Sequence, residues 1–141
     1  MWTQLNPRIT ELCRHHFENE IYADCILTAL REINTIVKAH VLGEAGQEYD
    51  GVDLMRKAFS FQYNRNTGNV DRMPIILLVD HLDSETSRNL QDGYMNIFAG
   101  SFSAFRNTKA HENMNPSRNR TIHMLYLCSL LMYKLDESNM N

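Results

Sequence analysis

A chain of 141 residues that is 43% apolar and 22% charged has the length and composition of one globular domain with a sizeable buried core. Its formal net charge of -3 argues against a protein that coats nucleic acid non-specifically, because such proteins carry a strong basic excess. That charge still leaves room for a small, local basic site. The three cysteines are far apart and form no CxxC pair, so we expect buried, reduced thiols in a cytosolic protein.

Two helices are predicted in the first third of the chain. Asn6 followed by Pro7 is typical of an N-cap and a first helical position, and a short helix is expected to run to about His16. Apolar residues spaced by three and four then predict a longer helix from Ile21 to Leu42. Gly43, with a second glycine three residues later, is expected to end it.

The middle of the chain gives weaker signals. Gly51–Phe61 is expected to hold a short helix with its apolar residues on one side. Gln62–Met73 is rich in Asn, Arg and Gly and is predicted to be an exposed loop. Pro74–Asp80, with the sequence PIILLVD, fits either a short strand or a buried connector, since periodicity cannot decide over so few residues.

Two more helices are predicted in the second half. A long one starts at Ser84, with Asp83 or Ser84 as its N-cap and Glu85 in its first turn. Its aromatic side chains recur every three or four residues and are expected to form core or a dimer interface: Tyr94, Phe98, Phe102 and Phe105. The segment NMNPS breaks the chain, and the last helix is expected from about Pro116 to Asp136.

These elements predict an all-α fold, a bundle of four or five helices in a single domain over residues 1–141. The start, MWTQLNPRITEL, has no long apolar stretch behind a basic region, so no signal peptide is expected. The longest apolar run, Ile122–Tyr133, is too short to span a bilayer, which needs about 20 residues. We therefore expect a cytoplasmic protein with no membrane partner.

The stretch FRNTKAHEN, from Phe105 to Asn113, carries the candidate chemistry. Arg106 offers a planar charged fork for phosphate oxygens, Asn107 offers an amide donor, and His111 titrates near neutral pH. On an unbroken helix Arg106 and His111 would lie about 140° apart, so they can converge only if the helix bends or ends near Asn107. On spacing alone, a solvated helix end is the simpler interpretation.

The surroundings of this stretch are locally basic. Lys109, Arg118 and Arg120 join Arg106 against one acid, Glu112, and are candidates for holding a polyanionic substrate. An Arg and a His are enough to cleave RNA without a metal, because the His can transfer protons while the Arg stabilises charge on the phosphate. The six histidines show no HExxH or paired Cys/His spacing, so we expect no metal and no other cofactor.

The segment FRNTKAHE resembles the signature of HEPN-superfamily domains, in which a His follows an Arg and a polar residue after a short gap. The sequence on both sides of this segment is more similar to the Ymh family of uncharacterised prokaryotic and phage proteins. That resemblance runs from WTQLNPRI through YADCILTALREIN, DGVDLMRKAFS and LQDGYMNIFAG to YLCSLLMYKLD. It leaves out the segment from about Gln62 to Leu82.

The resemblance implies a HEPN-like helical bundle that dimerises and acts as a metal-independent endoribonuclease, often as a toxin or phage-defence effector. Arg106 and His111 match the catalytic pair, and Asn107 matches the polar position. Thr108 stands where relatives usually have Pro. Three functions therefore stay open: an active ribonuclease, an inactive module that binds RNA, a nucleotide or a partner protein, and a structural partner of an antitoxin or another defence subunit.

Overall fold

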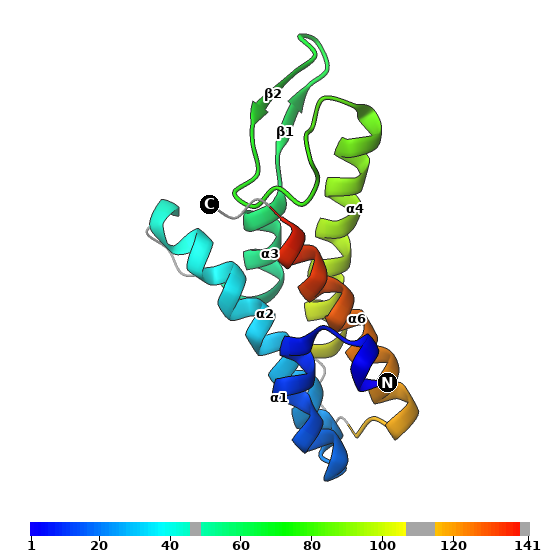
Figure 1. Ribbon diagram of the computed structural model, residues 1–141. Coiled ribbons are helices and arrows are strands. Elements are labelled where there is room, and N and C mark those ends of the chain that lie inside the picture. The colour runs from blue at the N-terminus through cyan, green and yellow to red at the C-terminus, as the bar shows by residue number, and fades with distance from the viewer. Residues whose placement is uncertain (46–48, 107–114, 139–141) are drawn as a thin grey trace.

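The computed structural model describes residues 1–45, 49–106 and 115–138, with the backbone alone at 42–45 and 106. Over these residues the chain is mainly helical, as predicted (Figure 1). None of the helices within the described residues is long and apolar enough to cross a membrane. The elements in chain order are a 3-10 turn η1 (Trp2–Gln4), α1 (Pro7–Glu18), α2 (Tyr22–Ala45), α3 (Gly51–Phe59), β1 (Gln62–Asn64), β2 (Asn69–Arg72), α4 (Glu85–Ser101), a π-helical turn η2 (Phe102–Arg106) and α6 (Arg118–Glu137).

Helix α1 has the predicted N-cap but ends two residues later than predicted. The Asn6 side chain accepts a hydrogen bond from the backbone N–H of Arg8 at 3.0 Å. At the other end Glu20 takes a left-handed conformation with φ 60°, and its N–H donates to the carbonyl of Phe17. The N–H of Ile21 donates to the carbonyl of His16, which completes a Schellman motif without its usual glycine.

Helix α2 is the centre of the fold and packs against α1, α3 and α6. Its side chains at Ile26, Ile33 and Val37 are fully buried, in agreement with the predicted helical spacing. The predicted end at Leu42 was three residues short, because α2 continues past Gly43 to Ala45, which precedes the second of the two predicted glycines. A glycine inside a helix costs about 1 kcal/mol, which is small beside the burial of the rest of α2.

One polar side chain of α2 fixes the start of α3. The Asn34 amide donates to the Asp50 carboxylate at 2.9 Å and accepts from the N–H of Gly51 at 2.9 Å. Gly51 has φ 56°, a conformation that favours glycine. Asn34 thus satisfies a backbone donor at the first turn of α3, where Asp50 itself makes no side-chain cap.

We expect Asn34→Ala to lower the free energy of unfolding by about 1–3 kcal/mol, because it leaves the Gly51 N–H without its acceptor in a half-buried site. Urea unfolding followed by circular dichroism measures the change. Asn119→Ala is the matched control, since Asn119 is exposed on α6 and its loss should change stability by less than about 0.5 kcal/mol. Equal changes in both variants would contradict the capping role of Asn34.

A β-hairpin replaces the loop predicted for Gln62–Met73. Strands β1 and β2 are antiparallel, with Tyr63 opposite Val70 and Asn64 opposite Asn69. The Asn64 side chain accepts from the N–H groups of Asn66 and Thr67, and Gly68 has φ 74° in the turn. The strands are too short and too polar for an alternating pattern to reveal them. The hairpin projects beyond the helices, beside the first turn of α4 (Figure 1).

The segment Pro74–Asp80 was predicted as either a short strand or a buried connector, and it is a buried connector. Ile76 is fully buried and its N–H donates to the carbonyl of Ala58 at 2.9 Å. The buried Gln91 of α4 holds this connector through the carbonyl of Ile76 and the N–H of Leu78. The hairpin and the connector are therefore tied to both α3 and α4.

Helix α6 closes the bundle against α2 and the chain start. The N–H of Asn6 donates to the Ser129 hydroxyl at 2.7 Å, and the Asn6 amide donates to Asp136 at 2.9 Å. Asn6 therefore caps α1 and also joins α1 to α6. The Ser117 side chain caps α6 by accepting from the N–H of Arg120 at 3.1 Å.

Candidate functional site

The predicted Arg–His motif begins at the end of η2. Arg106 is the last residue of this π-helical turn. The predicted residues Asn107, Lys109 and His111 lie outside the described residues. The motif thus starts at the end of a helix irregularity, and the bend predicted near Asn107 lies outside the described residues.

The irregularity begins at Ser101. Its hydroxyl donates to the carbonyl of Ile97 at 2.7 Å, one turn back in α4. Such a bond competes with the regular helix ladder and often accompanies a bend. The chain then widens into the π-helical turn from Phe102, while Phe98 and Phe102 stay buried. Single π-turns within helices occur frequently at functional sites.

The start of α6 lies on the other side of the motif in sequence. Ser117 caps this helix, so the positive end of its dipole and its first N–H groups lie beside Asn115 and Pro116. Thr121 adds a hydrogen bond from its hydroxyl to the Ser117 carbonyl at 2.8 Å. This end of α6 is therefore well ordered, electropositive and suited to an anion.

A cleft of about 430 Å³ separates the end of η2 from the start of α6. Its lining combines one cation with mostly apolar or small groups: Ala104, Phe105, Asn115, Pro116, Arg120 and Met124. The predicted Arg120 thus reaches the cleft that adjoins the motif. Arg120 is exposed, so its charged fork can meet an anion that enters the cleft.

The predicted Arg118 takes a different position. Its guanidinium carbon lies 5.3 Å from the ring centre of Phe17, in a cation–π contact. It lines a separate cleft of about 360 Å³ that Trp2 and Tyr22 also border. Residues two apart on a helix point about 200° away from each other, so Arg118 and Arg120 enter different clefts.

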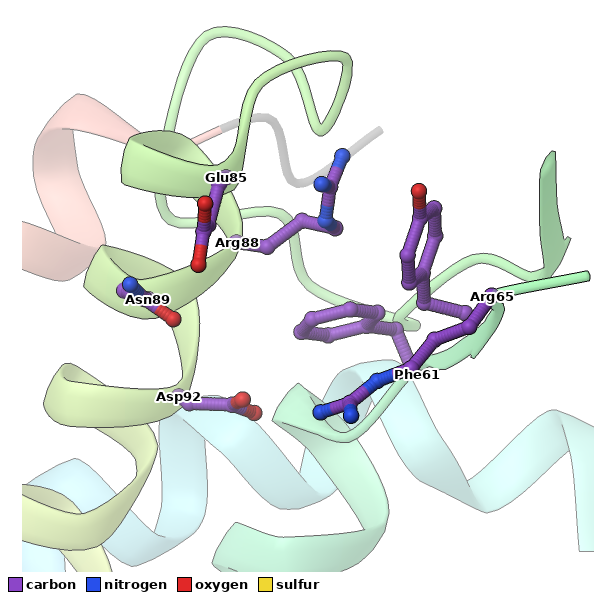
Figure 2. A pocket seen from close by; sticks show the side chains of 7 residues that line it. Phe61, Arg65, Glu85, Arg88, Asn89 and Asp92 are labelled. Carbon is purple, nitrogen blue, oxygen red and sulfur yellow. The ribbon is translucent and has the colours of Figure 1, made fainter. Parts of the chain in front are cut away.

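A third cleft, of about 520 Å³, lies at the opposite end of α4, between that helix and the hairpin (Figure 2). Its walls carry aromatic and charged side chains from both sides: Phe61, Tyr63, Arg65, Glu85, Arg88, Asn89 and Asp92. Loss of hydration in this cleft raises the pKa of the Asp92 carboxyl above its usual value.

The model of one protein family, described as "Protein of unknown function (Hypoth_ymh)", matches residues 3–135. The chain belongs to the Ymh family. No curated protein and no solved structure matches the chain. The Ymh match covers the motif and both of its flanks. It also covers Gln62 to Leu82, the segment that the resemblance in sequence leaves out.

Sequence reasoning missed the hairpin cleft of this Ymh protein. The sequence predicts Arg65 only as part of the exposed loop Gln62–Met73 and assigns no function to Asp92. Two signals were present. Glu85, Asn89 and Asp92 follow the i, i+4, i+7 spacing of one helix face, and a Thr-Gly pair typical of a turn lies between Tyr63 and Val70. The spacing alone could not show that the hairpin covers that face of α4.

Proposed function

We propose that this Ymh-family protein is a HEPN-like, metal-independent endoribonuclease that acts in the cytoplasm. The observation that supports this most is the cleft between η2 and the capped start of α6, with Arg120 in its wall. That cleft adjoins both ends of the segment that holds the Arg–His motif. A phosphate there would meet the guanidinium of Arg120 and the positive end of the α6 dipole.

The reaction is an internal displacement at phosphorus. The RNA 2′-hydroxyl loses its proton to a base and attacks the adjacent phosphate, while the bond to the 5′-oxygen breaks and that oxygen gains a proton. His111 acts as general acid or base, Arg106 stabilises the charge of the transition state, and Asn107 positions the phosphate. Lys109 and Arg120 hold the backbone of the strand at this cleft, and Arg118, which lies in the separate cleft beside Phe17, contacts the strand outside it. The products are a 2′,3′-cyclic phosphate and a 5′-hydroxyl.

Cleavage of RNA in buffer containing a metal chelator tests this proposal. We expect the purified protein to cut single-stranded RNA and to leave 2′,3′-cyclic phosphate ends, which are identified by mass spectrometry. Activity that the chelator abolishes, or products with a 5′-phosphate, would contradict the mechanism. A toxin or phage-defence role would add an antitoxin or another defence subunit as partner, which copurification from cells would reveal.

A homodimer would bring two motifs together, and α4 and α6 offer a surface for it. The Lys134 ammonium lies 4.6 Å from the ring centre of Tyr94, so α6 and α4 approach each other there. Five large apolar side chains on these two faces are 37–49% exposed: Leu90, Ile97, Tyr126, Leu130 and Tyr133. Such a band of exposed apolar groups is typical of an interaction surface.

We expect Leu130→Lys to convert a dimer into a monomer, because it places a charge in the middle of that band. Light scattering at several protein concentrations gives the mass directly. Met73→Lys is the control, since Met73 is 52% exposed and belongs to neither α4 nor α6. A wild-type protein that is monomeric throughout would rule out this interface.

The alternative is a catalytically inactive HEPN-like module that binds RNA, a nucleotide or a partner protein through the same cleft. Thr108 favours it, since a residue other than Pro at this point leaves the backbone less constrained. A module of this kind would keep its affinity for RNA in the cleavage assay but release no product.

A further inference from the structure

The cleft between the hairpin and α4 has one aromatic wall that is held in place. The Arg88 guanidinium carbon lies 3.8 Å from the ring centre of Tyr63. The same guanidinium donates to the carbonyl of Leu82 at 2.9 Å. Arg88 therefore clamps the Tyr63 ring against α4, and Phe61 extends the aromatic lining toward the base of the cleft (Figure 2). Because Arg88 occupies one face of the Tyr63 ring, the ring of Phe61 is the aromatic surface on which a planar ligand can stack.

The opposite wall carries hydrogen-bonding groups on one face of α4. Glu85, Asn89 and Asp92 follow one another at i, i+4 and i+7. Among the described residues, neither carboxylate forms an ion pair within 4.0 Å. The carboxylates therefore remain able to accept hydrogen bonds from a ligand, and the Asn89 amide can donate or accept one.

Arg65 and Asp92 face each other across the base of this cleft. In Figure 2 the Arg65 guanidinium, which comes from the hairpin turn, points toward the Asp92 carboxylate on α4. A ligand between them must offer an acceptor to Arg65 and, next to it, donors to Asp92. It must also be flat enough to stack beside Phe61 and Tyr63.

We propose that this cleft binds a guanine base, with the Asp92 carboxylate on its N1–H and N2–H donors and Arg65 on its O6 acceptor. Guanine presents two adjacent donors beside one acceptor, so a carboxylate and a guanidinium together complement its edge. Uracil presents one N–H between two carbonyl oxygens, so it cannot donate two adjacent hydrogen bonds to a carboxylate. The loss of hydration that raises the pKa of Asp92 agrees with a partly enclosed acceptor.

This site is separate from the Arg–His motif. Helix α4 has 17 residues, and at about 1.5 Å per residue its two ends lie about 25 Å apart. The base bound here can belong to a free guanine nucleotide or to a single-stranded RNA. Its recognition does not depend on cleavage by His111, so the two proposals can fail independently.

Calorimetric titration of the full chain tests the site with GMP, AMP and two short 2′-O-methyl RNA strands that differ by one guanine-to-adenine change. These strands cannot be cleaved, because they lack the attacking hydroxyl. We expect the guanine probe of at least one pair to bind at least about 10-fold more tightly than its adenine counterpart. Binding of GMP identifies a nucleotide site, and binding of the guanine strand alone identifies a site for a base within RNA.

Asp92→Asn is expected to weaken guanine binding by at least about 10-fold, since the amide keeps one acceptor oxygen and sets an NH2 donor against the second guanine donor. Arg65→Gln should weaken it as well. Asp83→Asn is the matched control, because Asp83 is exposed just before α4 and does not line the cleft. All three positions are exposed, and thermal melting verifies that each variant folds. Equal affinity for guanine and adenine probes, no binding of either, or an unchanged affinity in Asp92→Asn would overturn the proposal.

Discussion

Replacing His111 by alanine is expected to lower RNA cleavage by about 10²–10⁴-fold, the usual contribution of a general acid or base. Affinity for RNA should stay within a few-fold of wild type, because the phosphate contacts assigned to Arg106 and Arg120 remain. Single-turnover cleavage, measured beside RNA binding in the same buffer, separates the two effects. This separation distinguishes an enzyme from a binding module that shares the cleft.

His123 provides the control for this experiment. It is exposed on α6, two turns or less from the capped start of that helix, and it carries the same titrating group. His123→Ala should leave cleavage nearly unchanged. Arg106→Ala should reduce both binding and cleavage, since a charged fork on phosphate acts in the bound and the transition states. Full activity in His111→Ala would show that another group moves the proton.

The second large effect is expected at Gln91, whose side chain is fully buried. Its carbonyl oxygen accepts from the N–H of Leu78 at 2.8 Å, and its amide donates to the carbonyls of Phe59 and Ile76 at 2.9 and 3.0 Å. Gln91→Leu keeps most of the volume but leaves these three backbone groups without partners. We expect the free energy of unfolding to fall by at least about 3 kcal/mol, on the basis of at least about 1 kcal/mol for each of the three unpaired groups.

Urea unfolding at equilibrium measures this loss, with the change in midpoint converted through the slope of the transition. Gln62→Leu is the matched control, because Gln62 is exposed on β1 and its replacement should change stability by less than about 0.5 kcal/mol. A Gln91→Leu protein as stable as wild type would mean that the connector can repack. The same variant should also lose guanine affinity, since Gln91 ties the base of the hairpin to α4.

The sequence was most informative where the chain is regular. Apolar residues at helical spacing predicted α2, and the Asn6-Pro7 and Ser84 caps located the starts of α1 and α4 to within a residue. The Schellman turn at Glu20 was not predicted, because a left-handed residue at this position is usually glycine. The ends of helices depend on single hydrogen bonds, which composition does not reveal.

The hairpin and its cleft depend on contacts distant in sequence. Gln91 appears in the sequence as one more polar residue of a helix, yet it makes hydrogen bonds with groups 13 to 32 residues away. Arg88 likewise reaches back to Tyr63. Similarly, the two-residue spacing of Arg118 and Arg120 does not reveal that Arg118 packs on Phe17, a residue distant in sequence, and so lies in another cleft. Long-range packing of this kind overrides local propensity.

The reactivity of the buried cysteines reports how often the helices of this bundle separate. The thiol of Cys13 donates to the carbonyl of Cys25 at 3.4 Å, and the thiol of Cys25 donates to the carbonyl of Cys13 at 3.5 Å. Both are fully buried, as is Cys128, whose pKa burial raises to about 12. A thiol reagent can reach them only while the helices are apart. The rate of thiol labelling under native conditions therefore measures how often α1, α2 and α6 separate. An RNA or guanine nucleotide that binds and stabilises the folded protein should lower this labelling rate in proportion to the stabilisation.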